Sequence, residues 1–131
     1  MIDVVEGALT PYLGDADRFA ISGPHVKLDS KQALGLSLAL HELATNATKY
    51  GALSREHGRV DISWQTDIFA SSAGFRFEWK EHGGPVVEKP KRLGFGSRVI
   101  ERSLAGYFNG SARIDYEADG LRLVFEAHGP D

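Results

Sequence analysis

The sequence contains no cysteine, no long hydrophobic run and no excess of positive charge. Without cysteine, these residues can form neither disulfides nor thiolate metal sites, which suits a reducing compartment. No apolar stretch approaches the roughly 20 residues that cross a membrane, and the first residues lack the pattern of a secretory signal. The net charge of −3 gives no basic face for nucleic acid. We therefore expect a cytoplasmic segment that contacts neither nucleic acid nor a membrane.

The composition is that of an ordinary globular domain, with 42% hydrophobic and 25% charged residues in a chain of 131. A chain of this length buries about two-thirds of the surface that its unfolded form exposes, which is enough for one core. Residues 1–17 resemble the end of a helix followed by a loop. We expect them to be the end of a linker from an upstream domain, with the folded domain at 18–131.

Hydrophobic periodicity and turn residues predict strands paired in hairpins, with helices between them. The expected elements, in order, are strands at 18–22 and 25–28 joined by Gly23-Pro24, a helix at 31–50, strands at 59–65 and 74–80, a loop at 81–96, a helix at 97–107, and strands at 111–116 and 121–127. This order favours the α+β class, as a two-layer α/β sandwich. Its sheet would be mixed but mostly antiparallel, with the helices on one face.

The long helix at 31–50 is predicted to begin at an Asp29-Ser30 cap and to end near Gly51. One apolar stripe follows helical spacing and consists of Leu36, Leu40, Leu43, Ala47 and Tyr50. A second, partly apolar flank consists of Leu34, Leu38 and His41. Two such flanks predict a helix that is covered on more than one side.

Between them the same helix carries polar residues at Glu42, Asn46 and Lys49, which share one face because they are four and three residues apart. The simplest interpretation is a solvated surface. A zinc hydrolase is a further possibility, since His41-Glu42 begins the pattern H-E-x-x-H. The fifth position is Thr45, however, so the second metal-binding histidine is missing.

Two glycine-rich segments follow, at Glu81-His82-Gly83-Gly84-Pro85 and at Gly94-Phe95-Gly96-Ser97. Backbone N–H groups that lead into a helix N-terminus are suited to binding phosphate. A carboxylate beside glycines can accept a hydrogen bond from the exocyclic amine of a base. Ordinary turns would explain the glycines equally well when they are taken alone.

Together these segments resemble the N, G1 and G2 boxes of the GHKL ATPases, and most closely the HWE group of sensor histidine kinases. The resemblance rests on His41 before Glu42, on E-x-x-x-N-A-x-K-Y from Glu42 to Tyr50, on Trp79-Lys80-Glu81 with HGGP, and on GFGSRVIER. It covers roughly residues 23–127. It implies the Bergerat type of α/β sandwich and an ATP-binding catalytic domain at 18–131. Two positions depart from the wider kinase pattern, because Glu81 replaces an aspartate and Pro85 replaces a glycine.

The resemblance also implies a role for each matching residue. Asn46 would bind Mg²⁺ through its amide oxygen, Lys49 would pair with a phosphate, and Tyr50 would pack beside the nucleotide or in the core. Glu81 would contact adenine. The remaining nucleotide-binding positions would be Gly83, Gly84, Gly94, Phe95, Gly96 and Ser97.

Two neighbouring residues are candidates for catalysis. Glu42 would act as general base or orienter for the accepting imidazole. His41 is placed with it by the motif, although a packed, hydrogen-bonded histidine is an alternative.

The implied reaction is transfer of the ATP γ-phosphoryl group to a histidine on a separate dimerisation domain. These residues show no such helical hairpin, so we expect the acceptor domain of the same kinase and a downstream response regulator to be its partners. Two alternatives remain open at this point. One is a GHKL serine kinase of the anti-sigma type, and the other is a nucleotide-binding interaction domain without transfer.

Overall fold

The computed structural model describes residues 2–10, 18–54, 57–66, 75–84, 100–102, 104, 110–117 and 120–127. Its elements are α1 (Ile2–Leu9), β1 (Phe19–Ser22), α2 (Ser30–Lys49), the short 3₁₀ helix η3 (Ala52–Ser54), β2 (Arg59–Thr66), β3 (Phe75–His82), β4 (Gly110–Glu117) and β5 (Gly120–Ala127). Residues 100–102 and 104 are also helical. The rest of the helix expected at 97–107 lies outside the described residues.

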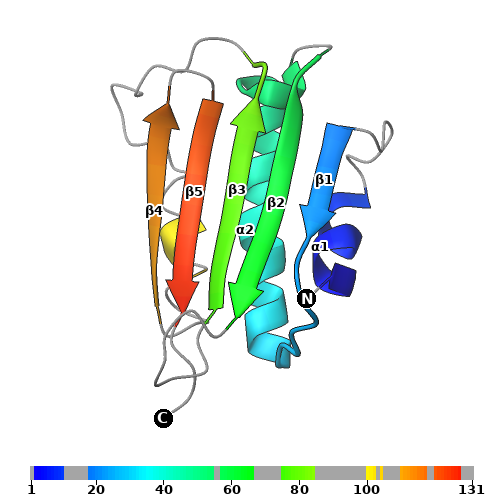
Figure 1. Ribbon diagram of the computed structural model, residues 1–131, viewed down its shortest axis with the longest axis vertical. Helices are drawn as coiled ribbons and strands as arrows, with labels where there is room; N and C mark the ends of the chain where they lie inside the picture. Colours follow the sequence, from blue (N-terminus) through cyan, green and yellow to red (C-terminus); the bar gives the residue numbers. More distant parts are fainter. Residues whose placement is uncertain are drawn as a thin grey trace.

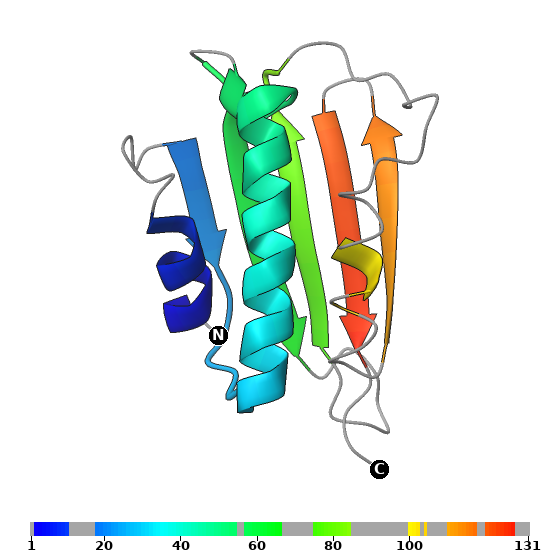
Figure 2. The same cartoon turned by 180° about the vertical axis from the view of Figure 1, so that it is seen from behind.

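The five strands form one sheet in the order β1-β2-β3-β5-β4 (Figure 1). β1 pairs with β2 in parallel, and the other three pairings are antiparallel. α1 and α2 lie on the same face of the sheet, as the view from behind shows (Figure 2). The prediction of an α+β sandwich with a mixed, mostly antiparallel sheet is therefore confirmed.

The expected strand at residues 25–28 is wrong, because 23–29 form no strand and β1 pairs with β2 instead. Pro24 and Trp64 explain the path of this segment, since the Trp64 indole donates a hydrogen bond of 2.6 Å to the Pro24 carbonyl. Gly23 lies so close to the ring that a Cβ there would be 2.3 Å from it. The segment is thus held as the connection from β1 to α2.

Helix α2 begins as the sequence predicts. The Asp29 carboxylate accepts from the Gln32 N–H at 2.7 Å, and the Gln32 side chain accepts from the Asp29 N–H at 3.1 Å. This capping box satisfies two N–H groups that the helix itself leaves free.

The apolar stripe of α2 is confirmed for its first four members, which are buried: Leu36, Leu40, Leu43 and Ala47. Tyr50 does not continue it, because the helix ends at Lys49 and the Tyr50 side chain is 75% exposed. The expected second covered flank is also wrong, since Leu34 and Leu38 are 50% and 42% exposed and His41 is exposed.

The core lies between the sheet and these helices. Alternate strand residues point into it because side chains alternate between the faces of a strand. Trp79 and Phe77 of β3 are fully buried, and Trp79 meets Phe19 edge-on with ring centroids 6.4 Å apart. Val5 and Leu9 of α1 belong to the same core. The boundary expected between residues 17 and 18 stays a prediction.

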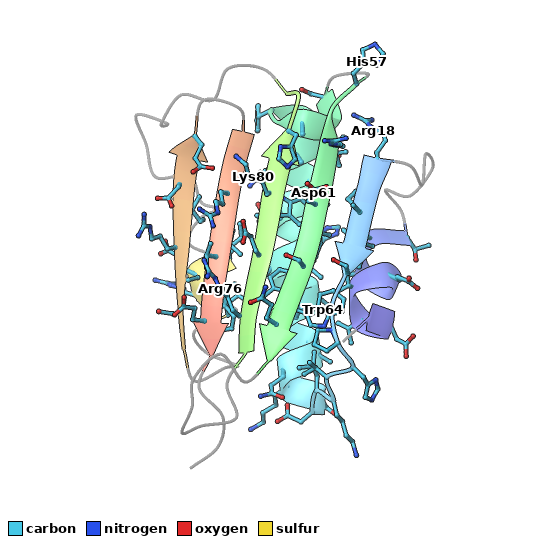
Figure 3. All side chains as sticks on the ribbon, in the orientation of Figure 1. Arg18, His57, Asp61, Trp64, Arg76 and Lys80 are labelled. Carbon is cyan, nitrogen blue, oxygen red and sulfur yellow. The ribbon has the colours of Figure 1, made fainter. Side chains whose placement is uncertain are left out.

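The other face of the sheet is polar, as the side chains turned toward the viewer show (Figure 3). Opposite charges pair across its strands, in the pairs Lys80–Glu117 and Arg122–Glu78, each at 2.8 Å, and the His82 Nε2 lies 2.8 Å from the Asp61 Oδ2. Such pairs each stabilise a fold by about 1 kcal/mol or less. Within the part of the chain that the structure describes, no helix is long and apolar enough to cross a membrane.

Candidate functional site

The predicted site residues that the structure describes lie toward the end of the sheet where α2 ends. β3 ends there, and β1, β2 and β5 begin there (Figures 1 and 2). β3 continues through Glu81 and His82, so these two residues belong to the strand and not to the expected loop. Strand geometry therefore decides which face of the sheet each of them occupies.

Glu81 is the one polar or charged side chain that the described residues bury, at 2% exposure. Its Oε1 accepts from the Ala52 N–H at 2.9 Å, and its Oε2 accepts from the Trp79 indole N–H at 3.1 Å. Burial raises the pKa of the Glu81 carboxyl, while the bonds from Ala52 and Trp79 and the charge of Lys80 act in the opposite direction. Two neutral donors thus hold a carboxylate inside the protein.

Ala52 links Glu81 to the neighbouring strands. Its carbonyl accepts from Nη2 of Arg18 at 3.1 Å, and Nε of the same guanidinium donates to the Gly58 carbonyl at 2.9 Å. Arg18 stands at the start of β1, at the same end of the sheet as His57 (Figure 3). The turn after α2 is therefore tied to β1, β2 and β3 at once.

Glycines allow the backbone segments at this end to approach one another. A Cβ at Gly51 would lie 2.1 Å from the Glu81 Oε1 and 3.1 Å from the Ala47 Cα. A Cβ at Gly84 would lie 2.8 Å from the Ala52 N and Cα. Gly83 has a φ of +73°, a conformation that favours glycine. The glycines of this first segment are thus required by space and conformation, whatever ligand approaches them.

Gly58 gives the clearest test of this packing, because a Cβ there would lie 1.7 Å from the Ala52 carbonyl oxygen. We expect Gly58→Ala to destabilise the fold by about 1–3 kcal/mol, since backbone must move to admit the methyl group. Gly7→Ala is the matched control, because its Cβ would meet nothing within 4 Å on helix α1. That change should stabilise by about 0.5–1 kcal/mol. Urea unfolding of both variants measures the difference, and equal stability would contradict this account.

The polar face of α2 ends beside this packed turn. Glu42 and Asn46 are both half-buried, and neither side chain has a hydrogen-bond partner within the described ranges. Lys49 and Tyr50 are exposed, and so is His41, which is therefore not a packed core residue. A half-buried amide and a carboxylate without partners are suited to a ligand that brings its own charge and donors.

These residues also fit Mg²⁺ in one particular way. No group of three or more metal-ligating side chains occurs within the residues that the structure places. Mg²⁺ retains several waters and takes one or two protein ligands beside substrate phosphates, so a single unpartnered amide such as Asn46 suffices. A closed structural metal site does not fit this arrangement.

Four predicted nucleotide-binding residues, Gly94, Phe95, Gly96 and Ser97, lie outside the described residues. Conversely, no motif in the sequence indicated a role for Arg18 or Ala52, and Trp79 appeared only as part of the Trp79-Lys80-Glu81 motif. Trp79 could have been found, because a strand places residues i and i+2 on one face. Arg18 and Ala52 gave no signal, since their bonds join segments that are distant in the sequence.

The sequence is similar to those of blue-light-activated histidine kinases from Brucella anthropi and Brucella ovis. The identities are 41% over 119 residues and 40% over 117 residues, or 90% and 88% of this chain. The chain spans only 24% of the length of these relatives. No protein-family model matches it.

Solved structures share the fold at low sequence identity. The catalytic domain of the histidine kinase ThkA superposes with a TM-score of 0.71 and 14% identity, covering 100% of this chain and 95% of that one. The histidine kinase domain of blue-light-activated EL346 from Erythrobacter litoralis gives 0.67 and 15%, covering 94% and 56%. These likenesses show the fold.

Proposed function

We propose that this chain, a sequence relative of the histidine kinases with the fold of their catalytic domains, is the ATP-binding catalytic domain of a sensor histidine kinase. It would transfer the γ-phosphoryl group of ATP to a histidine on a separate dimerisation domain. One observation carries the proposal. Helix α2, whose last turns bear Asn46, ends at Lys49, and the buried Glu81 carboxylate lies directly against Gly51, two residues beyond that end. The end of the helix that bears Asn46, an amide suited to a metal ion and phosphates, thus adjoins Glu81, a carboxylate suited to a nucleobase.

The proposed roles are those that the resemblance implies, and the environment of each side chain supports them. Asn46 would hold Mg²⁺ through its amide oxygen, and Lys49, exposed one turn later, would meet a phosphate. When bound, Mg²⁺ would neutralise charge on the phosphates. Phosphoryl transfer depends chiefly on positioning and on charge neutralisation, which these side chains can supply.

Glu81 would recognise the nucleobase of the bound nucleotide. A carboxylate accepts hydrogen bonds and cannot donate them when it is ionised, so it attracts the exocyclic amine of adenine and repels the carbonyl oxygen of guanine. Tyr50, which is 75% exposed, would pack beside the nucleotide. Gly83 and Gly84 would let the ligand approach the backbone.

The proposed partners lie in other parts of the kinase and in its signalling pathway. ThkA was solved in complex with the response regulator TrrA. For this chain we propose a phosphoacceptor domain of the same kinase and then a response regulator. The setting would be cytoplasmic.

Asn46→Ala tests the metal role. We expect wild-type protein to bind ATP about tenfold more tightly with Mg²⁺ than without it, because Asn46 would hold the metal ion and the ion would neutralise charge on the phosphates. The variant should lose most of that gain and keep its affinity for metal-free ATP.

Calorimetry with Mg²⁺ and with a chelator measures both affinities. Thr48→Ala is the matched control, because Thr48 lies on the same turn and its hydroxyl donates to the Ala44 carbonyl at 2.8 Å. Unchanged affinity of Asn46→Ala for Mg²⁺-ATP would remove Asn46 from the site.

A further inference from the structure

The Glu81 carboxylate is buried, and the residues that the structure describes give it no cationic partner. No described Lys, Arg or His side chain forms an ion pair with it, and the neighbouring Lys80 points to the other face of the sheet, where its Nζ pairs with Glu117. A buried charge without a counter-ion is costly unless donors satisfy it. The N–H groups of Ala52 and Trp79 must therefore supply the hydrogen bonds that stabilise the buried charge.

The Trp79 ring is held rigidly. It is fully buried, and it packs edge-on against Phe19 at an interplanar angle of 67°. A buried indole N–H needs an acceptor, and Glu81, two residues further along the same face of β3, provides it. The bond thus fixes a flexible carboxylate to an immobile ring.

The carboxylate keeps capacity for a ligand. An ionised carboxylate offers about four lone pairs, and Ala52 and Trp79 use one on each oxygen. The last torsion of a glutamate side chain is broad when it is not restrained. Two anchors remove that freedom before any ligand arrives, so the ligand does not bear the cost of ordering the group.

We propose that Trp79 is a positioning residue for base recognition, which holds the Glu81 carboxylate in the orientation that accepts the exocyclic amine of adenine. This inference rests on the proposed function, because it assumes that Glu81 reads the base. Trp79 itself does not touch the nucleotide in this account.

Trp64 supplies the matched control. It is the other tryptophan of the chain, 98% buried on the same face of the sheet, and its indole N–H is also bonded, to the Pro24 carbonyl. Trp64 lies toward the other end of β2, away from Arg18 and Lys80 (Figure 3). Trp64→Phe and Trp79→Phe therefore remove the same N–H group from comparable surroundings.

Competition between Mg²⁺-ATP and Mg²⁺-GTP should separate the two variants. We expect Trp79→Phe to reduce the preference for ATP about tenfold, since one hydrogen bond that orients a charged acceptor is lost. Trp64→Phe should keep the wild-type ratio. A folded Trp79→Phe protein with the wild-type ratio would overturn the proposal.

The pH dependence of the preference for ATP over GTP is a second measurement. A residue that acted only through packing would not change it. The preference requires an ionised Glu81, so it should be present above the pKa of this carboxyl and fade as pH falls through it. The Trp79 bond lowers that pKa, so Trp79→Phe should move the acid limb of the profile to higher pH. Trp79→Phe leaves unchanged the other titratable groups at this end of the surrounding elements, which include Arg18, Lys49, Tyr50, His57, Arg59, Asp61, Lys80 and His82.

Fluorescence tests the contact without nucleotide. In Trp64→Phe, Trp79 is the only tryptophan, and its emission should change with pH as Glu81 titrates beside it. Adding Glu81→Gln should abolish that change. A flat response in Trp64→Phe would overturn the positioning role even if ATP binds normally. Conversely, the fluorescence could change with pH in a protein that does not prefer ATP. That result would show that Trp79 contacts Glu81 but that Glu81 does not recognise the base. It would overturn the inference, and the fault would then lie in the assumed role of Glu81 in base recognition.

Discussion

Glu42→Gln in the full-length kinase is expected to reduce phosphotransfer by about a hundredfold or more, while affinity for ATP stays within a few-fold. Glu42 lies one turn before Asn46 on the same face of α2, half-buried and without a hydrogen-bond partner in the described part of the chain. A carboxylate there would repel the phosphates of bound ATP, so we do not expect it to serve binding. Our proposal is that it orients or deprotonates an incoming imidazole, because the attacking nitrogen must present its lone pair in line.

Radiolabelled ATP measures this transfer, and calorimetry measures binding. Glu126→Gln is a suitable control, since Glu126 lies on the far face of the sheet, where its nearest charged partner is Arg76 at 3.9 Å. The label should be acid-labile, as phosphohistidine is, which also separates this function from that of a serine kinase. Full transfer by Glu42→Gln would remove Glu42 from the reaction.

Glu81→Ala should abolish a preference for ATP over GTP that we expect to be on the order of a hundredfold in the wild-type protein. The charged acceptor is buried, and the wrong base brings a carbonyl oxygen against it in place of a hydrogen-bond donor, a difference of a few kcal/mol. Glu81→Gln should also lose the preference, because its NH2 group would replace one of the two oxygens that accept from Ala52 and Trp79.

Competition binding at neutral pH gives the ratio for each variant. Glu78→Gln is the matched control, because Glu78 belongs to the same strand but faces the other way and pairs with Arg122 at 2.8 Å. It should leave the ratio unchanged. Equal binding of the two nucleotides by the wild-type protein would contradict this role of Glu81.

Local interactions made many of the secondary-structure features of this protein predictable from its sequence. The Asp29 cap, the period of α2 and the alternation of β2, β3, β4 and β5 each involve residues a few positions apart, so they can be read along the chain. The polar face of Glu42 and Asn46 follows from the same helical period. The family resemblance then gave these residues their predicted roles.

Only the tertiary structure decided which distant segments meet. The parallel pairing of β1 with β2 overrode the hairpin expected at Gly23-Pro24, because Trp64 holds the Pro24 carbonyl from 40 residues away. Tyr50 does not belong to the apolar stripe, because the helix ends at Lys49, one residue before the predicted end.

The surroundings of Glu81 were decided in the same way. The N–H of Ala52 reaches it from 29 residues away. The sequence showed that a carboxylate stands at this position, and strand alternation places Trp79 on the same face of β3. The other donor, Ala52, comes from the turn after α2. Periodicity carries no information about that contact, since it forms only when the fold brings this turn to the end of β3.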